Sequence, residues 1–461
     1  MANTSSAESA LGGREPLSLA LTLGWAVGTF SMATIYSASS VLLLGYLVNN
    51  VGLAAGTAGL LFGASKLYDA IVDPIIGVVS DRTRSRWGRR RPFILAGTLV
   101  SALTFWLLFR LPVNLSPGML TTVTAVALLA NATGYALFVI PYLAMPAEMT
   151  TDPTQRTRLM AYRVGATSLG QVMGSFVAPL LIASFGGGLP GHAVMGGVLA
   201  FIVLLTGLAC FFATAKAKYT DRVEGHSMGV VAQFRTAFQN HHFAILMGVK
   251  MTSLLYVAVS TVITPFLFTQ ILHQSYKVLG YFFLAKSIAM LVTQPLWVKL
   301  TARYGRYAAY YIGAVGLAVT TLPWLLCTPE TPLTTILGLG VANGLASGGM
   351  LLIGQALLPD AIGQDFRRTG LRREGVFAGV YTVVERASFA LAASMTGIVL
   401  GAMGYVASKG GPVAQPPSAI LGIYLCLGGS LVFVALSAFC LHFYPRDAAK
   451  PEAVPGNTVK A

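Results

Sequence analysis

The sequence predicts an all-α polytopic membrane protein with twelve transmembrane helices, and three observations lead to this fold class. Of its 461 residues, 55% are hydrophobic and only 10% are charged, whereas soluble globular chains carry about 25% charged residues. The mean hydropathy is +0.70. The apolar residues also form stretches of about 20, the length that a helix needs to cross the hydrocarbon core of a bilayer. These observations exclude a soluble enzyme, a disordered chain and a disulfide scaffold.

Charged or Gly/Pro-rich breaks separate the twelve expected segments. The first segment is too long for the core of a signal peptide, and its leader contains Glu8 and an Arg14/Glu15 pair instead of a basic region. We therefore expect it to remain in the mature protein. In order, the segments comprise residues 17–46, 55–80, 92–112, 118–146, 159–185, 193–214, 243–271, 277–300, 307–327, 333–358, 376–404 and 418–444.

Basic residues gather in alternate loops. The side opposite to these loops carries only Arg110, Lys277 and Lys409. Because Lys and Arg mark cytoplasmic loops, both termini are expected in the cytoplasm, and the chain is expected to be a multi-pass protein of the inner or plasma membrane. The net charge of +15 is then explained by the basic cytoplasmic loops, and no nucleic-acid partner is expected. The basic loops hold Arg82 to Arg91, Arg156 and Arg158, Lys216 to Arg235, Arg303 and Arg306, and Arg367 to Arg373.

The longest polar connection, from Lys216 to His242, divides the chain into two sets of six segments. The halves resemble each other: Asp73-Pro74 precedes an arginine-rich loop, and Gln294-Pro295 precedes Arg303-Tyr304-Gly305-Arg306. Such repeats are typical of transporters whose binding site lies between two related halves. The expected organisation is an N-terminal cytoplasmic tail (1–16), a six-helix bundle (17–214), a cytoplasmic linker (215–242), a second six-helix bundle (243–444) and a C-terminal cytoplasmic tail (445–461).

Three charged residues share one face of the second segment. Lys66, Asp69 and Asp73 are spaced i, i+3 and i+7, which places them on the same side of a helix. Charges within a bilayer are costly, so such residues indicate function by default. Two carboxylates one turn apart can hold a small cation, Na⁺ being the only metal ion indicated, or can share a proton. A static ion triad that fixes helix packing is the alternative.

The fifth and eleventh segments carry further charges at membrane depth. Arg163 follows Tyr162 about one turn inside the fifth segment, where it can bind a solute through its forked donors or extend to the membrane interface. Glu385 and Arg386 are adjacent and point in different directions around a helix, so the sequence leaves open which one faces the cavity. Lys250 and Lys286 are weaker candidates because each can extend to the membrane interface or pair locally.

Catalytic chemistry has no visible residues in this chain. No hydrolase elbow, Walker loop, HExxH motif or Rossmann glycine pattern occurs in a suitable context, so we expect no enzyme and no cofactor. The four cysteines lie within apolar segments without CxxC spacing and are interpreted as small core residues.

Several motifs give the sequence a close resemblance to the glycoside-pentoside-hexuronide:cation symporters of the major facilitator superfamily, of which melibiose permease is the familiar member. The resemblance covers nearly the whole chain and implies the major facilitator fold, with two six-helix bundles. The motifs are Tyr68 to Gly77, Asp81 to Pro92, Ile140 to Ala144 with Glu148 to Thr150, Arg156 to Arg163, and Thr369 to Gly375.

The resemblance implies roles for individual residues. Asp69 and Asp73 match the acids that bind Na⁺, Li⁺ or H⁺, and Lys66 matches a basic position beside them. Arg163 matches an arginine near the sugar. Tyr142, Tyr162 and Glu385 are assigned to the same solute site. The residues expected to form the cytoplasmic latch are Gly77, Asp81, Arg82, Gly88, Arg89 and Arg90.

Departures from the family pattern concern the solute. Two acids that hold the galactoside in melibiose permease correspond to Ala33 and Val139, and a tryptophan position corresponds to Leu143. The helix 11 lysine position is Glu385. The set that recognises a galactoside is therefore missing, and the cavity is expected to be more apolar.

The favoured interpretation is a monomeric secondary transporter that moves a glycoside, sugar or sugar-like solute together with a cation by alternating access. Protons are favoured over Na⁺, because only Asp69 and Asp73 provide side-chain oxygens and a proton needs just one carboxylate. A cation-coupled carrier of lysolipid or another amphiphile is the first alternative. A sensor or scaffold that does not transport is the alternative from another class.

Overall fold

The computed structural model describes residues 17–150, 152–217, 235, 237–369, 374–411 and 413–444, and within these ranges it contains helices and no strand. The two expected tails, most of the linker and residues 370–373 of the last family motif lie outside the described residues. Each of the twelve expected segments coincides with one helix or with consecutive helices. These are α2 (Leu19–Asn49), α3 (Ala55–Arg82), α4 (Arg91–Leu108), α5 (Pro117–Met149), α6 and α7 (Pro153–Val172 and Ala178–Ser184), α8 (Gly188–Ala213), α10 (His241–Phe266), α11 and α12 (Tyr276–Val292 and Gln294–Tyr304), α13 (Arg306–Thr321), α14 (Leu333–Thr369), α15 (Glu374–Ala402) and α16 (Pro417–His442).

Length and hydropathy make these helices suitable for crossing a membrane. Within the described residues, ten continuous helical stretches are long and apolar enough to span, and α11 with α12 forms an eleventh that bends by 44°. Helix α3 has 28 residues, or about 42 Å at 1.5 Å per residue. It is not among these stretches, and it carries Lys66, Asp69 and Asp73 within its length.

Most helices differ from their expected bounds by a few residues, and three differences concern α6, α14 and the eighth segment. Helix α6 begins at Pro153, because Asp152 caps it by accepting a hydrogen bond from the Thr154 N–H at 2.8 Å. Arg163 therefore lies ten residues inside the helix, about three turns, whereas one turn was expected. Helix α14 continues past Pro359 to Thr369. The eighth segment breaks at Thr293, just before Pro295, since proline cannot donate to the preceding turn.

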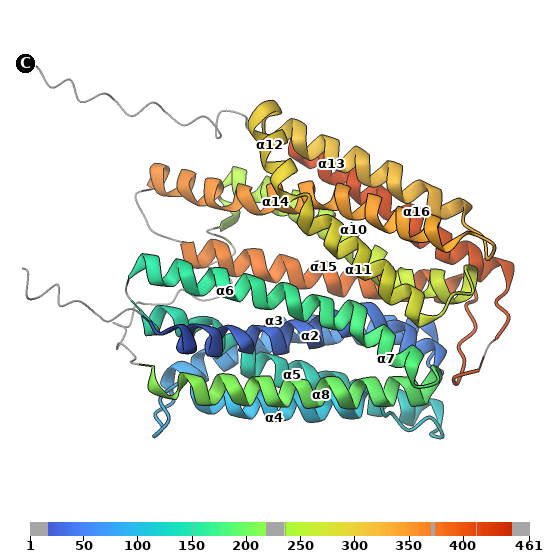
Figure 1. Ribbon diagram of the computed structural model, residues 1–461, viewed down its shortest axis with the longest axis horizontal. Coiled ribbons are helices and arrows are strands. Elements are labelled where there is room, and N and C mark those ends of the chain that lie inside the picture. Colours follow the sequence, from blue (N-terminus) through green and yellow to red (C-terminus); the bar gives the residue numbers. More distant parts are fainter. Residues whose placement is uncertain are drawn as a thin grey trace, which may run out of the picture.

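Two helical bundles lie side by side along their length (Figure 1), and each contains six of the twelve segments. Helices α2 to α8 form one bundle, shown in the lower part of the view, and α10 to α16 form the other. Helix α15 packs along α3, and α11 packs against α7. These contacts, together with that of α10 against α2, join the bundles.

Close backbone approaches between the bundles occur at the end opposite to the arginine-rich loops. A Cβ added at Gly59 would lie 2.7 Å from the Ala393 carbonyl oxygen and 2.7 Å from the Gly397 Cα. The Tyr405 hydroxyl donates to Asn49 Oδ1 at 2.8 Å at the same end. The absence of side chains at both glycines thus lets α3 and α15 come together here.

Candidate functional site

The charged face of α3 forms the centre of the site. Asp69 is nearly fully buried, at 3% exposure, and its Oδ2 lies 4.0 Å from the Lys66 Nζ. The Lys66 ammonium also lies 5.5 Å from the centre of the Tyr36 ring and 5.8 Å from that of Phe62, distances typical of cation–π contacts. Lys66 is therefore held in place by one carboxylate and two aromatic rings.

Arg386 reaches this face from the other bundle. Its Nη1 forms an ion pair with Asp73 and lies 3.9 Å from Asp69 Oδ2. Two cations and two carboxylates thus form one cluster, with Lys66 and both acids on α3 and Arg386 on α15. Of the adjacent pair on α15, Arg386 and not Glu385 contacts the acids of α3.

Two carboxylate oxygens in the cluster lack a hydrogen-bond partner among the described residues, and one backbone carbonyl beside them lacks its usual helical donor. Asp69 Oδ1 and Asp73 Oδ1 are buried and accept no hydrogen bond from the described residues. Pro74 has no N–H, so the Ala70 carbonyl loses its usual helical donor. A proton can bind either carboxylate directly. A small metal cation can use these oxygens only beside the Arg386 guanidinium, which repels it.

A second ion pair lies next to the first along α15. The Lys250 Nζ of α10 donates to Glu385 Oε2 at 2.9 Å. The Lys250 side chain is buried, at 8% exposure, whereas the Glu385 side chain is 44% exposed. Consecutive residues of α15 therefore contact different helices: Arg386 contacts α3 of the first bundle, and Glu385 contacts α10 of its own bundle.

The three remaining residues assigned to the solute site lie apart from this cluster. Tyr142 is buried within the first bundle, where its hydroxyl donates to the Trp25 carbonyl at 2.9 Å and its ring stacks on Trp25. Tyr162 lines an apolar groove between α2 and α6. Arg163 is partly buried, and its Nε has no hydrogen-bond partner among the described residues. The solute roles of these residues stay predictions.

The residues expected to form the latch gather around Arg90. Its side chain forms an ion pair with Asp81, donates to Ser80 Oγ at 2.7 Å and lies 3.0 Å from Glu148 Oε1. Arg89 lies 3.5 Å from the same Glu148 oxygen. These contacts tie the ends of α3, α4 and α5 together within the first bundle.

The other residues assigned to the latch form no ion pair in it. Gly88 has φ +87°, which favours glycine. At Gly77, an added Cβ would meet Ile140 at an ordinary 3.7 Å. Arg82 is exposed and forms no ion pair with the described residues. Sequence reasoning missed the corresponding pair in the second bundle, Arg306 with Asp360.

Among the described residues, no group of three or more His, Cys, Asp or Glu side chains is placed to bind a metal ion. The cluster on α3 offers two carboxylates. Two carboxylates so placed are chemically able to bind a proton or a monovalent cation, and Arg386 is an internal cation beside them.

A twelve-segment, two-bundle helical protein with a charged cluster between its bundles is a membrane transporter of the major facilitator type. The family model described as MFS/sugar transport protein matches residues 24–448, and the chain belongs to this family. It is a transporter and not an enzyme.

Relatives that match along nearly the whole chain are named symporters, transporters or carriers. The chain is 25% identical to the putative glycoside/cation symporter YagG of Escherichia coli over 95% of its own length and 94% of the relative. It is 25% identical to the isoprimeverose transporter of Lactiplantibacillus pentosus, covering 93% and 89%. It is 26% identical to the glucuronide carrier protein homolog of Escherichia coli, covering 95% and 94%.

Solved structures are similar in fold. The nucleoside transporter NupG gives a TM-score of 0.64 at 14% identity, covering 92% of this chain and 99% of that one. A bacterial homolog of the human lysosomal transporter Spinster, in an inward-facing and unoccupied conformation, gives 0.65 at 14% identity, covering 94% and 98%.

Proposed function

We propose that this chain couples the transport of a sugar or sugar-like solute to the movement of protons by alternating access, with Asp69 and Asp73 as the coupling site. The observation that carries the proposal is the ion pair between Asp73 and Arg386, because it joins the two bundles that must move relative to each other. The names of the relatives support a solute of the glycoside type.

Protonation of Asp73 weakens this ion pair between the bundles. An ionised Asp73 holds the Arg386 guanidinium of the opposite bundle, whereas a protonated Asp73 loses the charge that holds it. A bound proton therefore favours the conformation in which α3 and α15 separate. A ligand shifts a conformational equilibrium only through different affinities for the two states, and breaking this pair provides such a difference.

Sodium is disfavoured at the same site. A hard cation needs several oxygens, and those of Asp69, Asp73 and Ala70 lie beside a positive charge that already neutralises the acids. A proton neutralises a single carboxylate and requires no coordination shell. Arg386 thus supports the choice of H⁺ over Na⁺.

The orientation and assembly follow from the same proposal. With the arginine-rich loops in the cytoplasm, both termini are cytoplasmic, and the close contacts at Gly59 and Gly397 shut the pathway on the outer side. One chain contains both bundles, so a monomer is sufficient for the cycle. The membrane is the inner or plasma membrane of the cell.

The experiment is uptake into proteoliposomes at fixed pH. A screen of glycosides, uronates and lysolipids against the purified protein, with and without Na⁺, first supplies the solute. Accumulation is then measured with Na⁺ replaced by choline, in the presence or absence of a protonophore. We expect uptake to survive the loss of Na⁺ and to collapse with the protonophore.

The opposite result assigns the coupling to Na⁺. Uptake that collapses in choline, but survives the protonophore under an imposed Na⁺ gradient, would refute proton coupling. Asp73→Asn should abolish accumulation, while Glu330→Gln, which removes an exposed acid far along the chain, should behave as wild type. Absence of flux for every solute tested would favour the sensor or scaffold.

One observation favours a second candidate, an amphiphile carrier. The groove between α2 and α6 has a volume of about 480 Å³, and its lining is almost entirely apolar, including Leu23, Phe30 and Leu169. Such a groove fits an acyl chain. Lysolipid binding that is lost in Ala166→Trp, which fills the groove, while glycoside binding is absent, would support this candidate over the first.

A further inference from the structure

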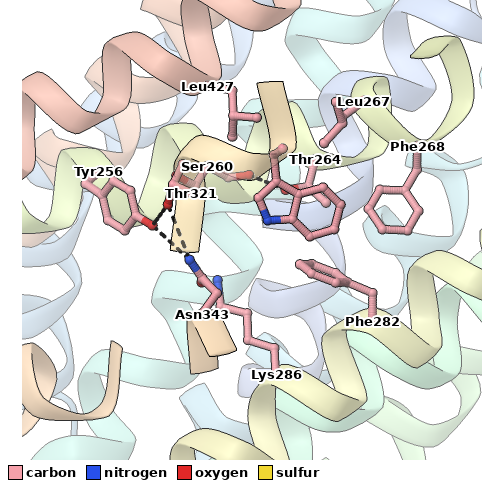
Figure 2. Close-up of a pocket in the computed structure, with 11 residues that line it drawn as sticks. Tyr256, Ser260, Thr264, Leu267, Phe268, Phe282, Lys286, Thr321, Asn343 and Leu427 are labelled. Atoms are coloured by element: carbon pink, nitrogen blue, oxygen red, sulfur yellow. Dashed lines mark hydrogen bonds between the residues drawn. The ribbon is translucent and has the colours of Figure 1, made fainter. Parts of the chain in front are cut away.

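A small cavity inside the second bundle contains a lysine that the coupling site does not use. Tyr256 and Ser260 of α10, Lys286 of α11 and Asn343 of α14 line it, with Thr321 at the end of α13. The cavity has room for about one water molecule. Figure 2 shows the Lys286 side chain extending toward Asn343. All of these residues belong to the second bundle, so the cavity is an internal feature of that bundle.

Hydrogen-bond donors line the polar side of this cavity. The Asn343 amide donates to the Tyr256 hydroxyl at 3.2 Å and to Thr321 Oγ1 at 3.4 Å, and the two hydroxyls lie 3.0 Å apart. The opposite wall is aromatic, since Trp324 packs against Phe282 with ring centres 5.3 Å apart. An ammonium, an amide and two hydroxyls therefore face a small space with an apolar wall, which is a lining suited to an anion.

The internal repeat of the chain places a similar cavity in the first bundle. Tyr256, Phe282 and Lys286 each follow a residue of the same type by 220 positions. Those residues, Tyr36, Phe62 and Lys66, line a small cavity together with an asparagine, Asn131. Lys286 is thus the repeat counterpart of Lys66.

The acids that accompany Lys66 have no counterpart in the second bundle. At the same separation of 220 residues, Asp69 corresponds to Ala289 and Asp73 to Thr293. Among the side chains that the structure describes, no carboxylate lies within ion-pair distance of Lys286. Lys66, Lys250 and Arg386 all have such a partner. The ammonium of Lys286 is therefore uncompensated.

Lys286 also lies deep in its membrane-spanning segment, where its side chain is partly buried. It follows Tyr276, the first residue of α11, by ten residues, which is about 15 Å along the axis. A charge at this depth is costly and needs a partner. A water molecule in the cavity can accept a hydrogen bond from the ammonium but leaves its charge uncompensated. Since the described side chains supply no acid, the partner is expected to come from outside the chain.

We propose that this cavity binds a monatomic anion, chloride, through Lys286, Asn343 and Tyr256. The site goes beyond the proposed transport function, because it lies within one bundle and its ligand is not the solute. The anion compensates the ammonium of Lys286, as Asp69 compensates that of Lys66. The aromatic wall strengthens this ion pair by lowering the local dielectric constant.

The size of the cavity sets the class of anion. A space for about one water molecule admits a chloride or bromide ion, which is only slightly larger than water. Carboxylates and phosphate contain several heavy atoms and do not fit. The site should therefore distinguish chloride from an organic anion such as gluconate.

The test is thermal unfolding of the purified full-length protein at constant ionic strength, with sodium gluconate replaced stepwise by sodium chloride. The Na⁺ concentration stays the same throughout, so only the anion changes. A ligand that binds the folded state alone raises the melting temperature. We expect saturating chloride to raise the Tm of wild type by about 2 °C or more, and bromide to act in the same way.

Three variants assign this shift to the cavity. Lys286→Gln should lose most of the chloride-dependent rise in Tm. Asn343→Asp is nearly isosteric and places a carboxylate inside the cavity, so it should also abolish the rise, because an internal acid then compensates Lys286. The matched control is Lys277→Gln, which removes a positive charge from an exposed position of the same helix and should keep the wild-type rise. Gel filtration confirms that each variant is folded.

A crystal of wild type grown in bromide locates the ion without any substitution. We expect an anomalous scattering peak beside Lys286. An empty or water-filled cavity in that crystal, a wild-type Tm that is the same in chloride and gluconate, or an equal chloride-dependent rise in wild type and Lys286→Gln would each overturn the site.

Discussion

A single methyl group at Gly59 should shift the protein away from the conformation described here. The Cβ of Gly59→Ala would lie 2.7 Å from the Gly397 Cα and 2.7 Å from the Ala393 carbonyl oxygen, whereas carbon atoms pack best at about 3.5–4.0 Å. Both obstacles are backbone atoms of α15, so no side-chain rotation can relieve the clash. The helices must therefore separate by roughly 1 Å at this end.

The magnitude follows from the cost of overpacking, which is about 1–3 kcal/mol. The penalty applies only to the conformation in which α3 and α15 touch at this end. If the other conformation holds them apart, as alternating access requires, the ratio of the two populations changes by about 5- to 150-fold. Gly338→Ala is the matched control, because a Cβ there meets nothing within 4 Å.

Double electron–electron resonance measures the separation directly. Spin labels at Asn114→Cys and Glu330→Cys report on exposed loops of the two bundles at this end, in a background where Cys440 is serine. We expect Gly59→Ala to increase the long-distance population and Gly338→Ala to leave it unchanged. A folded Gly59→Ala protein with the wild-type distance distribution would refute the reasoning.

Three further predictions concern individual side chains. Arg386→Gln should give the protein measurable Na⁺ binding, because the Asp73 oxygens lose their internal cation. Isothermal titration calorimetry with NaCl measures this binding. A variant that binds no Na⁺ would contradict the competition between Arg386 and a metal ion. Glu148→Gln should lower the free energy of unfolding by about 3 kcal/mol, because it leaves the buried Arg90 without one of its acids. Denaturation of the detergent-purified protein measures this change. A change below about 0.5 kcal/mol, the range of ordinary surface substitutions, would argue against the latch. Arg163→Ala should weaken solute binding more than Arg163→Lys does, if the guanidinium contacts solute; near-native affinity in both variants would assign Arg163 to the membrane interface.

Much of the fold could be predicted because the bilayer imposes it. A helix needs about 20 apolar residues to span, so the twelve segments and their order follow from hydropathy. Their ends were less predictable, since they depend on local hydrogen bonds. The cap at Asp152 moved the start of α6 back by six residues, and α14 continued through Pro359 where a break was expected.

The charged face of α3 was also predictable, because the spacing of Lys66, Asp69 and Asp73 alone places them together. Their partner on α15, Arg386, could not be predicted. Glu385 and Arg386 are adjacent, and only the rotation of α15 about its axis decides which one faces α3. That rotation is set by packing of glycines such as Gly397 against the other bundle, which depends on contacts between distant parts of the chain.

Missing partners are harder to find in a sequence than residues that are present. Lys286 was a weak candidate because a lysine usually finds an acid nearby. Its isolation became visible only when the structure showed which carboxylates the other cations occupy. The repeat signal was nevertheless available, because Lys66 and Lys286 are separated by nearly the same distance as the prolines at 74 and 295.

The most direct test of the central claim is proton movement driven by solute in sodium-free proteoliposomes that contain a pH-sensitive dye. Adding a glycoside that binds the purified protein to the outside should acidify the interior with wild type. Asp73→Asn should still exchange labelled solute but should move no protons. Proton movement that persists in Asp73→Asn, or solute entry with wild type that moves no protons until Na⁺ is added, would contradict Asp73 as the proton-coupling residue.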